Sequence, residues 1–321
     1  MGKKNFFNEE TKETFLSNFN EESRNTYSYV FRNSKEMEEL IEKDVYDFTI
    51  NQIGKLLESL KLSTSNAAKT YGRVISSYIN WAIENNLKSE PNPLKHIGNE
   101  WFEQFVNKIK LFITEKELID IEEKLVNYQD KVIMRLIFEG VSGYSLSELI
   151  NLTKEDIKGN TLHLIDEKSG ERYLEVSDRA IAFIEKAIDE TIYYNKNGTS
   201  EGRRSTAPLS QNDYVIKMTL LRSDQDSNKK SDKHLIYRRL STISELFGLE
   251  YLTSKSLERS GMVKMGKDLL EKDGKLENEQ LVKIAERFAV KKVIINGYET
   301  YNYFMLREFI NIENIEDLYG K

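Results

Sequence analysis

The stretch GVSGYSLSELINLTKEDI, residues 140–157, follows the apolar run VIMRLIFE at 132–139. Its two glycines punctuate a turn, and the leucine and isoleucine spacing that follows predicts a short helix over 146–152, then an acidic turn and a strand. The tip of such a turn, at the mouth of a helix, suits a side chain that binds phosphate. Ser145 stands at that tip, and serine carries no charge.

The elements after this turn predict a mainly α domain with a small antiparallel sheet. The run 131–141 is almost continuously apolar and predicts a helix buried on most sides. Residues 113–126 predict a helix that starts with a capping box, Thr114 with Glu117 three residues later. Residues 160–177 alternate around a Lys-Ser-Gly turn and predict a β-hairpin. The remaining expectations are helices over 177–194, 234–248, 260–274 and 278–290, and an exposed polar loop over 195–208.

The residues before the turn predict a small helical bundle. Helices are expected over 23–43, with Ser23 as N-cap, and over 45–60 and 63–86. The third helix shows one apolar face, formed by Ala67, Tyr71, Val74, Tyr78 and Trp81. Pro91 and Pro93 then end helical structure. We therefore expect two domains, 1–97 and 98–321.

Composition excludes several classes of protein. The 321 residues include no Cys and three His, which excludes a thiol enzyme and argues against a zinc site. No glycine-rich phosphate loop precedes a helix, so neither a nucleotide cofactor nor a metal is expected. No apolar run approaches the ~18 residues of a membrane span, so we expect a soluble cytoplasmic protein.

Positive charge is concentrated in two stretches although the net charge is −6. Residues 61–110 hold 7 basic against 4 acidic side chains, and residues 222–264 hold 9 against 6. Phosphates respond to such local patches rather than to net charge. Charge alone leaves open whether these stretches bind nucleic acid or arise by chance.

The order of elements, together with Gly143-Tyr144-Ser145-Leu146-Ser147-Glu148-Leu149, resembles the tyrosine recombinase (phage integrase) family across nearly the whole chain. The family's motif reads glycine, apolar, arginine, apolar, Ser-Glu-Leu. The bundle resembles its SAM-like core-binding domain, and the rest resembles its catalytic domain. By this resemblance, Ser145 occupies the position of the first catalytic arginine.

The resemblance also assigns the other active-site positions. Lys168 matches the hairpin lysine that protonates the leaving oxygen. In TSKSLERSG, residues 253–261, Lys255 replaces a histidine, Glu258 replaces the second arginine and Arg259 follows it. A later Gly-His pair falls on Ala289 and Val290. The nucleophile position falls on Tyr298 or Tyr301, and the spacing does not decide between them.

These replacements predict a recombinase fold without recombinase activity. Strand transfer builds charge on phosphate oxygens, which the two arginines would neutralise. Loss of one comparable donor removes about 3–4 kcal/mol of transition-state stabilisation, and a carboxylate adds repulsion. Three alternatives stay open: a divergent active recombinase, a helix-turn-helix repressor motif at 146–157, and an accessory protein that binds an integrase.

DNA binding would survive such losses, because the family clamps duplex DNA mainly through phosphates. The expected function is sequence-specific binding of double-stranded DNA as a prophage transcriptional repressor that maintains lysogeny, in the host nucleoid, as in the recombinase-derived repressors of SPβ-type Bacillus prophages. Self-association on DNA or a regulatory phage protein is a further expected partner, and residues 311–321 could pack on a neighbour or on their own domain. The expected DNA-binding residues are Arg24, Asn25, Thr26, Tyr29, Arg32, Ser65, Lys69, Thr70, Arg73, Ser76, Ser77, Lys168, Arg172, Arg203, Arg204, Arg238, Arg239, Lys255 and Arg259.

Overall fold

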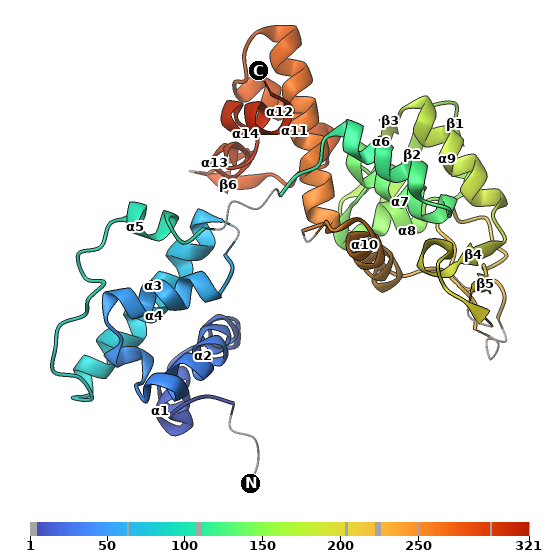
Figure 1. Ribbon diagram of the computed structural model, residues 1–321. Coiled ribbons are helices and arrows are strands. Elements are labelled where there is room, and N and C mark those ends of the chain that lie inside the picture. The colour runs from blue at the N-terminus through green and yellow to red at the C-terminus, as the bar shows by residue number, and fades with distance from the viewer. Residues whose placement is uncertain are drawn as a thin grey trace. The chain divides into compact units, whose positions relative to one another are not determined.

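The structure is a computed structural model of the chain. It describes residues 5–62, 64–106, 111–202, 205–221, 226–249, 251–295 and 297–320. The chain forms two compact units, Met1–Ile109 and Lys110–Lys321 (Figure 1). Both are mainly helical, and the described strands form small antiparallel sheets, all in the second unit.

The first unit is helical throughout its described residues. Polar N-caps start three of its helices: Asn20, Thr49 and Thr64 each accept a hydrogen bond from the first turn. Asn20, rather than the expected Ser23, caps the second helix, because the Asn20 side chain accepts from the Ser23 N–H. The helices are α1 (Glu9–Leu16), α2 (Glu21–Ile41), α3 (Ile50–Ser59), α4 (Ser65–Glu84) and α5 (Asn99–Glu103).

The core of this unit confirms the apolar face expected for α4. Val74 and Tyr78 are buried, and Ala67, Tyr71 and Trp81 pack against the same core. The unit continues past the proline pair, because α5 packs on α4. A Cβ at Gly72 would lie 2.1 Å from the Phe102 ring, so glycine is what allows this close contact.

A buried ionic cluster joins α1 to the end of α2. The Lys12 ammonium is fully buried, and it lies 2.7 Å from Glu38 and 3.3 Å from Asp44. It also donates to the Phe7 carbonyl. Burying a lysine is unfavourable unless it is paired in this way. The sequence did not predict α1.

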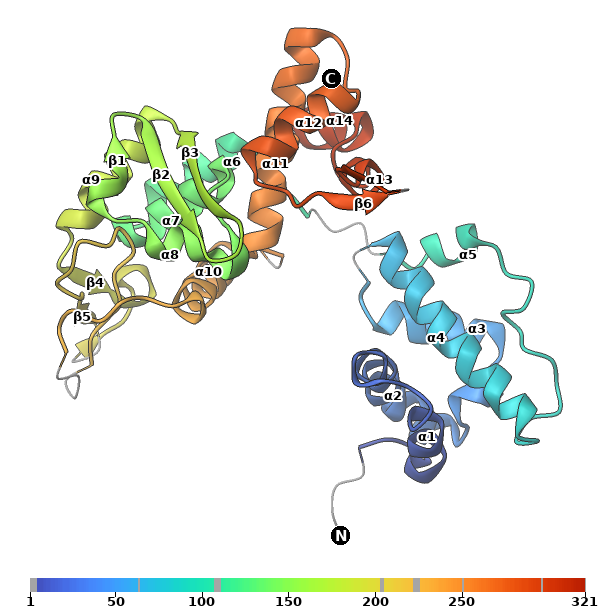
Figure 2. The same cartoon turned by 180° about the vertical axis from the view of Figure 1, so that it is seen from behind.

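The second unit begins with four helices and a three-stranded sheet, whose middle strand, β2 (Thr161–Asp166), lies beside α8 (Ser147–Asn151) (Figure 2). The capping box at Thr114 is confirmed, and the expected hairpin is confirmed as β2–β3 with Leu162 opposite Leu174. The expected buried helix is confirmed as α7, whose residues from Val132 to Phe138 are all buried. The elements are α6 (Glu115–Lys124), α7 (Tyr128–Glu139), α8 (Ser147–Asn151), β1 (Ile157–Lys158), β2 (Thr161–Asp166), β3 (Gly170–Glu175) and α9 (Asp178–Asp189).

Two expectations for the middle of this unit are wrong. The helix expected to reach Tyr194 ends at Asp189, and β4 (Ile192–Tyr194) follows. The loop expected over 195–208 ends in β5 (Thr206–Pro208), which pairs with β4. Residue Tyr193 of β4 is buried against Asp130, so tertiary contact decides this segment.

The last part of the chain forms a second apolar core. The helices are α10 (Lys233–Phe247), α11 (Ser254–Asp273), α12 (Asn278–Arg287), α13 (Tyr303–Arg307) and α14 (Ile312–Tyr319), and the hairpin β6 (Val293–Ile295) with β7 (Tyr298–Thr300) precedes α13. Helix α11 starts six residues before the expected 260. It contributes Leu257 to the core that α6 to α10 form with β2 and β3, and Val263 to the second core of the same unit, formed with α12 to α14. Of the two options for the tail, the structure shows packing on its own domain, with Ile315 buried against α11.

Candidate functional site

The turn at 143–146 is held by one carboxylate. Asp166, at the end of β2, accepts hydrogen bonds from the Tyr144 N–H, from the Ser147 hydroxyl at 2.8 Å and from the Lys168 and Ser169 N–H groups at 2.9 and 2.6 Å. Burial raises the pKa of Asp166, but these four hydrogen bonds outweigh it and leave the pKa well below its usual range. The turn is therefore fixed to the sheet by a permanent anion.

The backbone of the turn is strained where the family motif has its arginine. Ser145 and the following Leu146 both have positive φ, 55° and 66°. Gly143 also has positive φ, and a Cβ there would lie 2.4 Å from Asp166, so only glycine fits. Ser145 is half-buried and lies next to the exposed Tyr144.

Arg172 of β3 neutralises the glutamate of this motif. Glu148 is 1% exposed, and its two oxygens accept from Arg172 Nε at 2.6 Å and Nη2 at 2.8 Å. The same guanidinium also donates to the carbonyls of Gly140 and Arg287. Four bonds to the protein occupy it, so Arg172 holds the fold together and is not free to clamp DNA. This corrects the expectation for Arg172.

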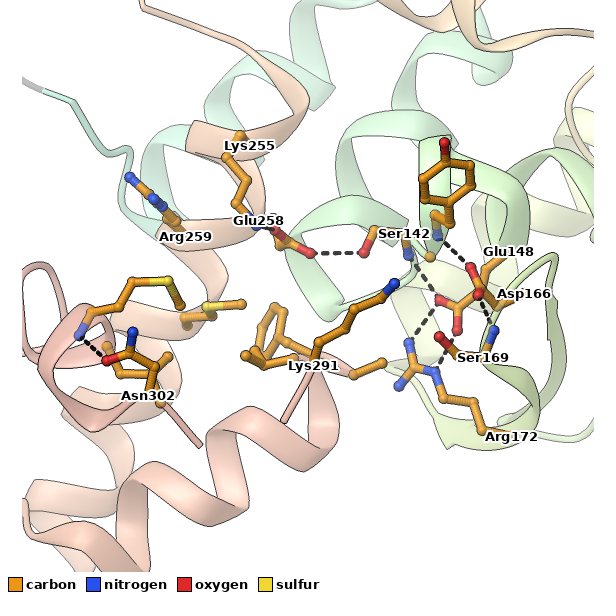
Figure 3. A pocket seen from close by; sticks show the side chains of 18 of the residues that line it. Ser142, Glu148, Asp166, Ser169, Arg172, Lys255, Glu258, Arg259, Lys291 and Asn302 are labelled. Carbon is orange, nitrogen blue, oxygen red and sulfur yellow. Dashed lines mark hydrogen bonds and ion pairs between the residues drawn. The ribbon is translucent and has the colours of Figure 1, made fainter. Parts of the chain in front are cut away.

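Glu258 faces the same pocket as a second buried carboxylate. It is 7% exposed, and it accepts from the Ser142 hydroxyl at 2.7 Å and from Lys255 Nζ at 2.5 Å. Lys255 is itself mostly exposed, with 64% of its side chain accessible. An anion therefore occupies the position to which the resemblance assigns the second arginine, and the neighbouring lysine is turned toward it (Figure 3).

Three cations surround the pocket without a carboxylate partner among the described residues. Lys168 Nζ lies 3.5 Å from the centre of the Tyr144 ring, and Lys291 Nζ lies 5.9 Å from the same ring. Arg259 stacks on the Phe309 ring at 4.7 Å, directed away from Glu258 (Figure 3). Sequence reasoning missed Lys291, although it directly follows Val290, which the resemblance had placed in the site.

The pocket formed by these groups has a volume of about 410 Å³. The turn and β3 form one wall, α11 forms another, and the segment from Phe288 to Val293 with α13 closes it. Figure 3 shows Lys291 extending across the pocket toward Ser142 and Glu148. Glu258, Arg259, Lys255 and Val290, expected together from the sequence, are thus brought together.

The two tyrosines at the nucleophile position differ in environment. Tyr298 lies on β7 and is 78% exposed. Tyr301 is 8% exposed within the second core, and burial raises its pKa. Neither is among the described residues that line the pocket.

Neighbouring arginines on α10 have opposite environments. Arg238 is exposed, whereas Arg239 is 4% exposed. Arg239 donates to the Lys217 carbonyl at 2.8 Å and lies 3.8 Å from buried Asp130. Arg239 is therefore a core residue, and the expectation that it binds DNA is wrong. Arg203 and Arg204 lie outside the described residues.

The expected DNA-binding residues of the first unit lie on the accessible sides of α2 and α4. Tyr29 of α2 and Tyr71 of α4 stack with ring centres 5.3 Å apart and join the two helices. Arg73, Ser76 and Ser77 line a groove of about 490 Å³ with Trp81. Exposed or half-buried members of the set are Arg24, Asn25, Thr26, Tyr29, Arg32, Ser65, Lys69, Thr70, Arg73, Ser76 and Ser77.

Several of these residues already have a partner in the same unit, including Arg24 with Glu13 and Ser76 with Asn92. Lys69 donates to Glu103 at 2.8 Å, and the Ser65 hydroxyl donates to it at 3.1 Å. Glu103 has a lowered pKa, chiefly because of the hydrogen bonds from Lys69 and Ser65. Lys69 and Ser65 would have to leave this carboxylate to contact a phosphate.

The described residues contain no group of three or more His, Cys, Asp or Glu side chains able to hold a metal ion. Among the helices that these residues form, none is long and apolar enough to cross a membrane.

Solved structures of tyrosine recombinases are similar to the chain over most of its length. The integrase of transposon Tn1549, in complex with transposon right-end DNA, has a TM-score of 0.47 and 10% identity and covers 96% of each chain. A lambda integrase dimer bound to a COC' core site has a TM-score of 0.46 and 12% identity, covering 89% of this chain and 79% of that one.

Sequence comparisons identify the family. Residues 6–84 match the family described as MrpR, N-terminal core-binding domain, and residues 112–320 match MrpR, C-terminal catalytic domain. A relative from Bacillus subtilis (strain 168), the SPbeta prophage-derived uncharacterized protein YopR, is 33% identical over 321 residues, which cover 98% of this chain and 97% of that protein. The chain thus belongs to the MrpR family and contains that family's N-terminal core-binding domain and C-terminal catalytic domain.

Proposed function

We propose that this protein is a sequence-specific double-stranded DNA-binding protein, a prophage transcriptional repressor that maintains lysogeny and lacks recombinase activity. The observation that carries the proposal is Glu258, a buried carboxylate in the pocket where the family places an arginine. The prophage origin of the YopR relative supports the biological setting.

Electrostatics at the pocket oppose strand transfer. A phosphate undergoing attack gains charge that fixed cations must stabilise. Here Ser145 is neutral, Glu258 is buried and anionic, and the Arg172 guanidinium is held by Glu148 and two carbonyls. Two like charges at about 4 Å repel by several kcal/mol at an effective dielectric near 20. The charges of the pocket therefore destabilise the transition state of cleavage.

Binding without cleavage needs only cations that reach the DNA backbone. Arg24, Arg32 and Arg73 in the first unit and Lys168 and Arg238 in the second are exposed and can serve this role. We assign DNA contacts both to the core-binding unit, Met1–Ile109, and to the catalytic-type unit, Lys110–Lys321. It places the protein on host DNA, in the nucleoid.

The proposal is tested by two assays on the full chain. Fragments of host and prophage DNA are selected for binding at fixed salt, and a selected fragment carrying a nick that traps a covalent 3′-phosphotyrosyl product is then incubated with the protein. We expect tight, salt-dependent binding and no covalent adduct. A covalent adduct that is absent from a Tyr298→Phe or Tyr301→Phe variant would establish the alternative, a divergent active recombinase.

A further inference from the structure

Buried apolar side chains form one side of the pocket, its floor. Met262, Phe288, Leu306 and Phe309 line it and are 2%, 3%, 0% and 5% exposed. The pocket volume of about 410 Å³ lies in the range of sites for small organic ligands, roughly 300–1,000 Å³. A DNA phosphate is polar and gains nothing from an apolar floor, so this apolar lining is not explained by DNA binding.

The charges around the mouth favour an anion. Each buried carboxylate of the pocket is already engaged: Glu148 by Arg172, Glu258 by Ser142 and Lys255, and Asp166 by the four donors of the turn. Lys291 and Arg259 have no hydrogen bond or ion pair within the part of the chain that the structure describes. Arg259 Nε is in addition shielded from solvent without an acceptor.

Lys291 lies at the opening of the pocket, next to the residues of its apolar floor. It follows Val290, which lines the pocket, and its side chain extends across the opening toward Ser142 and Glu148 (Figure 3). An ammonium over an apolar cavity matches a ligand with one anionic group and an apolar body.

We propose that this pocket binds a small organic anion with an apolar body, with its charge on Lys291 and its body against Phe288, Leu306 and Phe309. The anionic group and a DNA phosphate would compete for the same cations at the mouth. Ligand binding therefore weakens DNA binding, a regulatory step that rests on the proposed function.

The probe is 1-anilinonaphthalene-8-sulfonate, a fluorescent aromatic sulfonate, titrated into the full chain. We expect one saturable site per chain. Lys291→Gln should weaken binding about tenfold, as expected for one charge-assisted contact. Val290→Phe should fill part of the cavity and also weaken binding, with thermal melting to verify that each variant is folded.

Two control variants should leave probe binding unchanged. Lys267→Gln removes a lysine of α11 that pairs with Glu271 on the protein surface. Ile294→Ser removes the most exposed apolar side chain of the β6–β7 hairpin, which is 80% exposed. Loss of probe binding in Ile294→Ser, with no effect of Lys291→Gln, would move the site to the hairpin and overturn the proposal.

Two competitors separate the parts of the ligand. Sodium sulfate at equal ionic strength should displace the probe poorly. If sulfate competes as strongly as a non-fluorescent aromatic sulfonate of the same kind, the site recognises only the anionic group, and the proposed binding of the apolar body is wrong. The neutral analogue N-phenyl-1-naphthylamine should not discriminate between wild type and Lys291→Gln. If it loses affinity as the sulfonate does, the charge assignment is wrong.

DNA release distinguishes this inference from the proposed function. The probe should displace a selected DNA fragment from the wild type, and Val290→Phe should resist displacement. Tight DNA binding with no pocket-dependent probe binding would reject the inference alone. Pocket-dependent probe binding by a protein that binds no DNA fragment would reject the proposed function and leave the ligand site standing.

Discussion

Glu148 shows how far apart in the sequence the two residues of one contact can lie. The guanidinium that neutralises Glu148 comes from Arg172 on β3, 24 residues later in the chain. The sequence predicted Ser145 and Glu258 as altered positions from the residues around them, and this stays a prediction. The sequence could not show that Glu148 engages the Arg172 guanidinium, because this contact depends on the strand pairing that brings β3 to the turn.

Arg238 and Arg239 form a natural pair for testing burial. Arg239→Ala leaves Asp130, which is 3% exposed, without its cation, and should lower the free energy of unfolding by about 3–5 kcal/mol. Arg238→Ala, on the exposed side, should change it by less than about 0.5 kcal/mol. Denaturant unfolding of both variants measures the difference. Equal stability of the two would contradict the buried position of Arg239.

The contact between Asp130 and Arg239 predicts that the effect of Arg239→Ala depends on pH. Burial raises the pKa of Asp130, and the Arg239 guanidinium opposes that rise. Without the arginine the raised pKa rises further, and a group whose folded pKa is raised loses its stabilising contribution as the pH increases through that pKa. Arg239→Ala should therefore be less destabilising near pH 5 than near pH 8. A pH-independent difference would argue against a charged Asp130–Arg239 contact.

Glu258 gives a residue-scale prediction for DNA. Glu258→Gln keeps a partner for the Ser142 hydroxyl, removes a buried negative charge and frees Lys255. Binding of a selected fragment at low salt should become several-fold tighter, since about 1.4 kcal/mol corresponds to tenfold. Glu271→Gln, on the far exposed part of α11, is the control and should have little effect. Weaker binding by Glu258→Gln would place the pocket away from DNA.

At the scale of elements, patterns with strong periodicity were predictable and short segments were not. The capping box at Thr114 and the hairpin β2–β3 follow from local sequence. Strand β4 was predicted as the end of a helix because its tyrosines fit either pattern, and its partner β5 lies in a stretch that is polar in sequence. Helix α1 was missed because its buried Lys12 looks like a surface residue until Glu38 is placed beside it.

Close helix packing in the first unit depends on one glycine. A Cβ at position 72 would lie 2.1 Å from the Phe102 ring, so Gly72→Ala should destabilise the unit by about 1–3 kcal/mol. The obstacle is a side chain rather than backbone, so Phe102→Leu in the same protein should recover part of the loss. Gly98→Ala, where the nearest atom is 4.0 Å away, is the control. A harmless Gly72→Ala would show that α5 does not pack on α4.

At the scale of the whole chain, the C-terminal helix determines whether the tail needs a second subunit. Ile315 of α14 is 5% exposed against its own domain, whereas Ile312 of the same helix is 52% exposed. Ile315→Ala should lower the free energy of unfolding by about 2–5 kcal/mol, and Ile312→Ala should have a much smaller effect. The loss should not depend on protein concentration. A concentration-dependent loss would indicate that the tail packs on another chain.

If this chain of net charge −6 binds DNA, the binding has to come from local cations. Arg73 lies in the first unit and Arg238 in the second, and both are exposed. If each contacts a phosphate of the same duplex, each alanine variant should reduce the slope of log K against log salt by about 1, and the double variant by about 2. The free-energy losses should also add, because the sites share no partner.

A titration series on one selected fragment, at four salt concentrations, measures both the salt slope and the free-energy loss. A slope that changes for only one of the two variants would contradict DNA contact by the other residue.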